Sequence, residues 1–128
     1  IIISKSETGA AYIPVWPLIP HNINNEEGYQ IKMSNTDSMT FCGPKLLPQI
    51  YPITISEGWN MMSYIRDTPQ DAVEALNDIA DEIILVKDYL GNVYLPSMNY
   101  NGIGDLEPGK GYQIKMNSEQ ILIYDAND

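Results

Sequence analysis

The sequence predicts an α+β, strand-dominated fold of antiparallel hairpins, with one helix in each full repeat and two pseudo-repeated copies of which the first is truncated. Three observations predict it. The hexapeptide Gly-Tyr-Gln-Ile-Lys-Met occurs twice, at residues 28–33 and 111–116. Most apolar runs alternate with polar residues, as strands do, and only residues 68–83 show apolar residues at helical spacing. An internal repeat changes what counts as one structural unit.

The repeat extends well beyond the hexapeptide. Residues 1–14 match residues 83–96 at six of fourteen positions, with an offset of 82 against 83 at the hexapeptide. Such a one-residue length change belongs in a loop. We expect a partial repeat over residues 1–44, lacking the opening strand and helix, and a full repeat over residues 45–128, packed as one compact domain. A fragment of a longer tandem array and a permuted domain that shares one opening strand and helix both fit this pattern.

Each copy is predicted to contain a hairpin ahead of the hexapeptide. Two β-rich runs flank a short turn that holds Gly91 in the second copy and Gly9 in the first. Pro96 and Pro14 follow the second run, and proline ends a strand because it cannot donate to the ladder.

The hexapeptide itself is predicted to be a strand with alternate residues on one face. These residues are Tyr29, Ile31 and Met33 in the first copy and Tyr112, Ile114 and Met116 in the second. A short polar stretch and a second apolar run follow, so each hexapeptide is predicted to be the first strand of a second hairpin. Its Lys and Gln then point outward.

One helix is predicted, in the second copy only. Thr68 is the expected N-cap, Pro69 suits the first helical position, and Asp71 places a carboxylate in the first turn. The apolar face consists of Val73, Leu76, Ile79, Ala80 and Ile83. Residues 53–55 and 59–65, separated by a Glu-Gly break, are predicted strands ahead of this helix.

Composition excludes several classes of function. The net charge is −10, with seven Lys plus Arg against seventeen Asp plus Glu, which argues against a nucleic-acid partner. No apolar run approaches the roughly 18 residues of a membrane span. The single cysteine, Cys42, excludes an intrachain disulfide. We expect no cofactor and no metal site.

No candidate for catalysis or phosphate binding matches a full signature. Residues 104–111 resemble a phosphate-binding loop, but Gly111 lacks the hydroxyl that reaches the metal and a strand follows where a helix is needed. His21 is the only histidine and lies in a loop that the second copy does not match. Cys42 has no base tied to it. The protein is therefore predicted not to be an enzyme.

The acidic residues and the aromatic residues are further candidates for a metal or ligand site. The carboxylates of residues 67–88 are spread around a solvated face, and neither residues 99–102 nor 125–128 match a calcium loop. Trp16, which has no aromatic counterpart in the second copy, and Tyr100 are the candidate ligand-binding residues. The remaining aromatic candidates are predicted to be core, because the repeat places them at equivalent positions or in the opening strand: Trp59, Tyr12, Tyr94, Tyr29 and Tyr112.

Two motifs, Gly-Trp-Asn-Met-Met-Ser at residues 58–63 and Pro-Gly-Lys-Gly-Tyr at residues 108–112, resemble those of a repeat module in large secreted bacterial proteins. The first copy departs from the second motif, with Asn-Glu-Glu at residues 25–27. The resemblance implies a non-catalytic extracellular or cell-surface module, acting as a spacer or as an adhesion or interaction unit. Its expected partners are neighbouring repeats or copies of itself. The alternative is a carbohydrate-binding module of a secreted hydrolase, with a glycan as partner.

Overall fold

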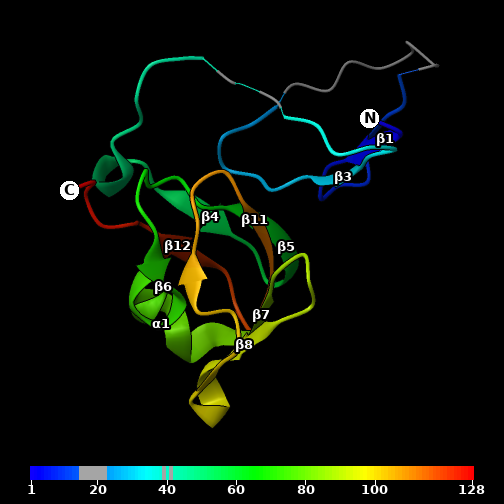
Figure 1. The fold of residues 1–128 in the computed structure, drawn as a ribbon. Helices are drawn as coiled ribbons and strands as arrows, with labels where there is room; N and C mark the ends of the chain where they lie inside the picture. The colour runs from blue at the N-terminus through cyan, green and yellow to red at the C-terminus, as the bar shows by residue number, and fades with distance from the viewer. Residues whose placement is uncertain (15–22, 39, 41) are drawn as a thin grey trace.

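The computed structural model describes residues 1–14, 23–38, 40 and 42–128 as a strand-dominated fold with short helices, in which every described strand pair is antiparallel (Figure 1). The strands are β1 (Ile3–Lys5), β2 (Ala11–Tyr12), β3 (Gln30–Lys32), β4 (Ile53–Ile55), β5 (Gly58–Ser63), β6 (Gln70–Asp71), β7 (Ile83–Lys87), β8 (Val93–Leu95), β9 (Tyr100–Asn101), β10 (Asp105–Leu106), β11 (Gly111–Met116) and β12 (Gln120–Leu122). The helices are α1 (Ala72–Ala75) and the 3₁₀ turns η1 (Pro48–Ile50), η2 (Asn77–Glu82) and η3 (Pro96–Met98).

A five-stranded sheet of order β5-β11-β7-β8-β9 forms the centre of the molecule. The second hexapeptide is β11, which pairs with β5 along one edge and with β7 along the other. The side chains of Tyr112, Ile114 and Met116 form the inner face of β11 and are buried. Every buried apolar residue of the described core lies between Ile53 and Tyr124. The core therefore belongs to the C-terminal part of the chain.

The predicted hairpin around Gly91 is confirmed. Strands β7 and β8 pair with Val86 opposite Tyr94, and Gly91 has φ +89°, a conformation that L side chains rarely adopt. The Asp88 amide donates to the Asn92 carbonyl at 3.0 Å and closes the turn. Pro96 ends β8 and begins η3.

The predicted hairpin after the second hexapeptide is wrong, whereas the one after the first hexapeptide involves residues 39 and 41, which lie outside the described residues. The hexapeptide strand β11 does not pair with β12, the apolar run that follows it; β12 pairs with β4 instead, with Ile121 opposite Thr54. Both edges of β11 are already occupied by β5 and β7, so no ladder is left for β12. The chain therefore crosses from one sheet to another at residues 117–119.

The predicted helix is present only in part. Residues 70–71 pair with β10 as strand β6, so Thr68 is not the N-cap and Pro69 is not helical. Asp71 is the N-cap, and its carboxylate accepts from the Val73 amide at 2.8 Å. The helix ends after one turn and continues as η2. The buried residues still recur at helical spacing (Ala72, Leu76, Ile79, Ile83), whereas Val73 is exposed, contrary to prediction.

Two of the aromatic residues predicted to be core are exposed. Tyr94 and Tyr112 are buried as expected, but the Trp59 side chain is 54% exposed and Tyr12 is also exposed. Trp59 alternates with the buried Asn60 along β5 and so lies on the outer face of the sheet. Trp59 was predicted to be buried because it is aromatic, but its position in the alternating pattern of β5 places its side chain on the exposed face.

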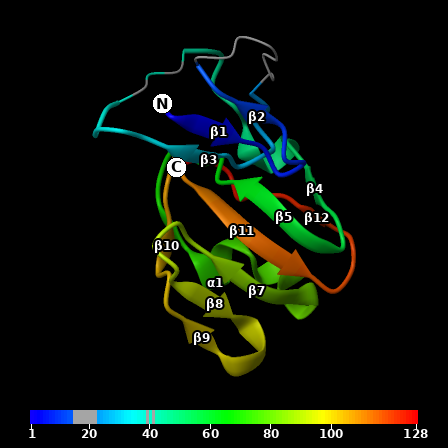
Figure 2. The ribbon, with the colours of Figure 1, turned by 90° about the vertical axis from the view of Figure 1, so that its right-hand side faces the viewer.

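A small N-terminal sheet of order β2-β1-β3 lies beyond β5, at one end of the molecule (Figure 1 and Figure 2). Within it Ser4 faces Tyr12 of β2 and Ile31 of β3. At the repeat-matched positions of the large sheet, Val86 faces Tyr94 of β8 and Ile114 of β11. The turn glycines match as well, since Gly9 has φ +81°.

The described residues 1–14 and 23–33, which carry β1, β2 and β3 and which we call the N-terminal unit, contact β5 through a few hydrogen bonds. The Gly28 amide donates to the Met61 carbonyl at 2.7 Å, and the Met61 amide donates to a Glu7 carboxylate oxygen at 2.8 Å. The Ser63 hydroxyl donates to the Asn25 carbonyl. A Cβ at Gly28 would lie 3.4 Å from the Cα of Gly111, so the first glycines of the two hexapeptides pack against each other. The N-terminal unit is thereby attached to the outer edge of β5.

Candidate functional site

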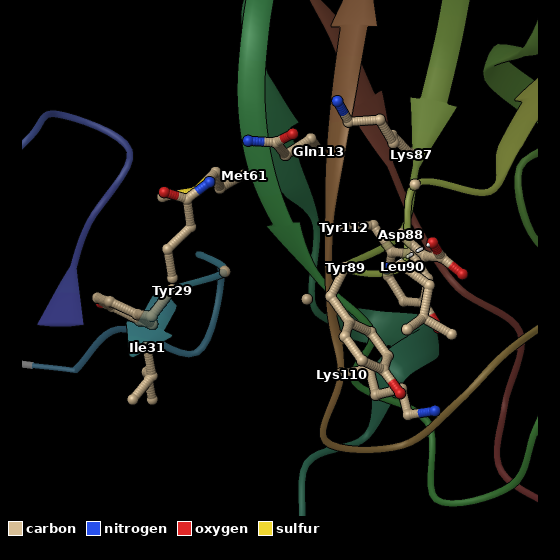
Figure 3. Close-up of a pocket in the computed structure, with 14 residues that line it drawn as sticks. Tyr29, Ile31, Met61, Lys87, Asp88, Tyr89, Leu90, Lys110, Tyr112 and Gln113 are labelled. Atoms are coloured by element: carbon tan, nitrogen blue, oxygen red, sulfur yellow. Dashed lines mark hydrogen bonds between the residues drawn. The ribbon is translucent and has the colours of Figure 1, made fainter. Parts of the chain in front are cut away.

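A groove runs between the N-terminal sheet and the outer face of the five-stranded sheet. It consists of two adjoining hollows of about 620 and 460 Å³, which share the lining residues Gln30, Met61, Lys87 and Gln113. We call this the inter-sheet groove. Figure 3 shows Tyr29 and Ile31 of the N-terminal unit on one side of it, and Lys87, Tyr89 and Lys110 on the other.

The smaller hollow of the inter-sheet groove contains two cross-strand Lys–Gln pairs. Lys5 lies opposite Gln30 in the N-terminal sheet, and Lys87 lies opposite Gln113 in the large sheet. All four side chains line the smaller hollow. Within the described part of the chain, neither Lys5 nor Lys87 forms an ion pair. Their ammonium groups are therefore available to an anion.

An exposed aromatic ring with a neighbouring lysine stands at each end of the groove. Trp59 lines the smaller hollow, with the Lys115 Nζ 5.6 Å from its ring centroid. Tyr89, 73% exposed, lines the larger hollow, with the Lys110 Nζ 5.4 Å from its ring centroid. A cation over an aromatic face at this distance is attracted to it, which holds both partners in place.

The rim near Lys110 is fixed by a turn ahead of β11. Gly109 has φ +76°, and Pro108 precedes it, the arrangement of a type II turn. The Glu107 amide donates to the Tyr112 hydroxyl at 2.9 Å, and burial raises the pKa of that hydroxyl. Lys110 Nζ lies 2.6 Å from Glu107, a hydrogen-bonded contact that raises the pKa of the lysine. This lysine is therefore already paired.

The same turn is built differently in the N-terminal unit. The Asn24 amide donates to the Tyr29 hydroxyl at 2.7 Å, and the Glu26 amide donates to the Asn24 side-chain oxygen at 3.1 Å. The Glu27 amide reaches the Asn24 carbonyl at 3.4 Å, as the Lys110 amide reaches the Glu107 carbonyl at 3.2 Å. An asparagine side chain thus takes over from the Pro-Gly pair, since asparagine mimics a backbone turn.

Asp88 shapes the turn that carries Tyr89. Its carboxylate accepts from the Leu90 amide at 2.9 Å, from the Asn92 amide at 2.8 Å and from the Asn92 side chain at 2.8 Å. Partial burial acts to raise the pKa of Asp88, but the hydrogen bonds from Asn92, Leu90 and Gly91 outweigh it and lower the pKa. The Asp88 carboxylate therefore holds the turn that carries Tyr89 in shape.

The groove concentrates positive charge on an acidic protein. Three of the chain's seven cationic residues line it, Lys5, Lys87 and Lys110, and a fourth, Lys115, lies over Trp59. The acids that line the groove are already held: Glu7 by the Met61 amide, and Asp88 by its own turn. The groove is thus lined by three positive side chains and two negative ones, on a chain of net charge −10.

The structure describes only one of the two predicted ligand-binding residues. Trp16 lies outside the described residues, as does His21. Tyr100, 53% exposed on β9, does not line the inter-sheet groove, and a Cβ at Gly102 would lie 2.8 Å from its hydroxyl oxygen. Cys42 is an exposed free thiol.

Residues of the two candidate calcium loops, 99–102 and 125–128, have hydrogen-bond or ion-pair partners within the protein. Asn101 accepts from the Gly104 amide at 3.0 Å and donates to the Asp71 carboxylate at 3.2 Å. Asp125 accepts from the Gln70 side chain, and Asp128 lies 3.6 Å from Arg66. Among the described residues there is no group of three or more His, Cys, Asp and Glu side chains suited to hold a metal ion.

The prediction missed Trp59 and Tyr89 as candidate ligand contacts. For Trp59 a signal existed, because the alternation of residues 58–63 puts Trp59 and Met61 on one face and Asn60 and Met62 on the other. For Tyr89 the signal was its place in the turn before Gly91, where a large side chain has little to pack against.

Comparison of the chain with models of known protein families, with curated proteins and with solved structures finds no match. The resemblance to a secreted bacterial repeat module therefore stays a prediction. None of the helices in the described ranges is long and apolar enough to cross a lipid bilayer.

Proposed function

We propose that the chain is a non-catalytic repeat module of an extracellular or cell-surface protein, made of a partial unit (1–44) and a full unit (45–128), and that it serves as a structural spacer or an adhesion unit. The observation that carries the proposal is the shared strand register: Ser4 pairs with Tyr12 and Ile31 as Val86 pairs with Tyr94 and Ile114. Repeat proteins are built by stacking such units on their neighbours.

The uncovered face of β3 supports neighbouring repeats, or copies of the chain, as partners. Ile31 is 45% exposed and Met33 is 39% exposed, although the same residues of β11 are buried. In the described N-terminal sheet β3 is an edge strand. An exposed apolar edge strand is a template for pairing with another chain.

Sedimentation velocity over a wide concentration range tests this proposal. We expect the protein to self-associate at high concentration and Ile31→Lys to reduce that association. The matched control is Ile121→Lys, which places the same charge on an exposed isoleucine of β12. A strictly monomeric species at millimolar concentration, or equal association of both variants, would contradict it.

A second candidate function, carbohydrate binding, is favoured by the exposed Trp59 in a hollow that also holds the polar side chains of Gln30 and Gln113. Exposed aromatic rings give large contact area at low entropic cost. A glycan array, run with the wild type and with Trp16→Ala, Tyr100→Ala and Trp59→Ala, tests this candidate. Binding that one of these variants abolishes supports it, and the absence of binding to every glycan leaves the spacer and adhesion proposal ahead.

A further inference from the structure

The inter-sheet groove combines three kinds of group along one path. The exposed rings of Trp59 and Tyr89 line the smaller and the larger hollow, respectively. Lys5 and Lys87, without an ion-pair partner among the described residues, line the smaller hollow, and each lies opposite a glutamine on the neighbouring strand. Ligand sites are concave and use a few placed polar groups on an apolar or aromatic lining. The path therefore fits an elongated ligand that has flat apolar faces, hydroxyl groups and negative charges.

We propose that the inter-sheet groove binds an acidic oligosaccharide built of uronic acid units. In this assignment the pyranose faces stack on Trp59, the sugar carboxylates pair with the Lys5 and Lys87 ammonium groups, and the Gln30 and Gln113 amides exchange hydrogen bonds with hydroxyls. The inference rests on the second proposed function, carbohydrate binding, and names its ligand class.

Charge is the first reason for an acidic rather than a neutral sugar. The chain carries ten more acidic than basic residues, yet Lys5 and Lys87 line the smaller hollow without an ion-pair partner among the described residues. Glu7 also lines this hollow, and its carboxylate accepts from the Met61 amide and keeps its negative charge. The hollow therefore holds two positive side chains against one negative side chain. Charge-assisted hydrogen bonds to an ammonium are roughly twice as strong as neutral ones, so a carboxylate gains most here.

The doubling of the Lys–Gln pair is the second reason. Lys5 with Gln30 and Lys87 with Gln113 occupy matched registers in the two sheets and line one hollow. Two equal polar pairs suit a ligand that repeats the same charged unit. An acidic peptide would also satisfy the lysines and the glutamine amides, but a run of acidic side chains lacks the flat apolar face that a pyranose ring offers to Trp59.

Calorimetric titration with the α-1,4-linked tetramer of galacturonic acid tests the proposal on the intact chain. Its methyl ester keeps the rings and hydroxyls and removes the charge, and a glutamate peptide of equal charge keeps the charge and removes the sugar. We expect the acidic tetramer to bind at least about 10-fold tighter than either control. Shifts in the amide NMR spectrum should centre on Trp59, Lys87 and Gln113.

Matched variants separate the groove from general attraction to a polyanion. We expect Trp59→Ala to weaken binding about 10-fold and Lys87→Gln about 5-fold. Lys45→Gln makes the same charge change at a lysine that pairs with Asp67 outside the groove, and we expect it to change affinity less than 2-fold. Unfolding curves of the three variants check that each is folded.

The outcomes are distinguishable. Equal binding of the tetramer and its methyl ester would overturn the acidic ligand and leave carbohydrate binding in place. Equal binding of the glutamate peptide, or equal effects of Lys87→Gln and Lys45→Gln, would overturn the sugar site in favour of general charge attraction. If neither the tetramer nor its ester binds, the inference fails, and the glycan array then decides whether carbohydrate binding fails with it; the sedimentation test of the repeat module is independent of both.

Discussion

The two copies of Gly-Tyr-Gln-Ile-Lys-Met have the same sequence and opposite environments. In β11 the side chains of Ile114 and Met116 are 0% and 1% exposed, whereas Ile31 and Met33 are 45% and 39% exposed. Both strands pair with a preceding hairpin in the same register. The difference lies in the elements around them, because β11 has a second neighbour, β5, and an inner face covered by the core. Local sequence therefore sets the strand, and its partners set the burial.

Truncating the equivalent isoleucines gives the largest predicted contrast. Ile114→Ala is expected to lower the free energy of unfolding by about 2–5 kcal/mol, because it leaves a cavity in a packed core. Ile31→Ala is expected to change it by less than about 0.5 kcal/mol, as exposed substitutions do. Urea denaturation measures both. Equal losses of unfolding free energy would show that β3 is packed as tightly as β11, contrary to the difference in burial described above.

The glycine contact between the hexapeptides gives the next effect. A Cβ at Gly28 would lie 3.0 Å from the Met62 carbonyl oxygen, so Gly28→Ala must push the N-terminal unit away from β5. We expect a local cost of about 1–3 kcal/mol, as for overpacking, with the global unfolding transition unchanged. Limited proteolysis should then cut residues 1–44 faster. Unchanged cleavage would contradict the attachment of this unit to β5 that we describe.

The matched turn glycines, Gly91 and Gly9, test whether the two units unfold separately. Gly91 and Gly9 both have positive φ and open space around the Cβ position, so alanine at either site costs only backbone strain, roughly 1–2 kcal/mol. For Gly91→Ala we expect this cost to appear as a lower midpoint of thermal unfolding. For Gly9→Ala it should appear only as faster amide exchange in β1 and β2. A drop in midpoint for Gly9→Ala equal to that for Gly91→Ala would mean that the two units unfold as one.

The smallest predicted effect is a pH dependence found in only one of the two turns. Hydrogen bonds from Asn92, Leu90 and Gly91 lower the pKa of Asp88, although partial burial opposes them. A carboxyl whose pKa is lowered by folding adds stability above its unfolded pKa, near 3.8, and that stability is lost as pH falls through the lowered value. Asp88→Asn should remove this acid-side slope at a cost of at most about 1 kcal/mol. Ser6, its counterpart in the first turn, has no charge to lose, so Ser6→Ala should leave the slope intact.

The sequence predicted the elements better than their connections. The alternation and the turn glycines predicted strands β7, β8 and β11 and the Gly91 hairpin, because these depend on local geometry. The pairing of β12 with β4 was missed, since it depends on β11 having two neighbours already. The helix was overextended because residues 70–71 pair with β10, a contact across the chain that helix propensity does not report.

Most of the candidate site could not be predicted from the sequence. It lies between two sheets, and the contacts that the N-terminal unit makes with β5 bring Lys5 and Gln30 near Lys87 and Gln113. The alternation of residues in β5 indicates that the Trp59 side chain points outward, but Trp59 was predicted to be in the core because it is aromatic. The Gln and Lys of the hexapeptide were predicted to point outward, and they are exposed in β3 and partly exposed in β11. The lysines of the groove pairs, Lys5 and Lys87, lie outside the hexapeptide, and nothing in the sequence placed the two pairs in one groove.

Native-state hydrogen exchange tests the central claim most directly, namely that two identical strands differ in stability because their neighbours differ. Exchange measures the opening free energy of each strand separately. We predict that the amides of β7 and β11 exchange only through global unfolding, and that those of β1 and β3 exchange through a local opening of lower free energy. Equal protection of β3 and β11, with the same response to denaturant, would contradict this account.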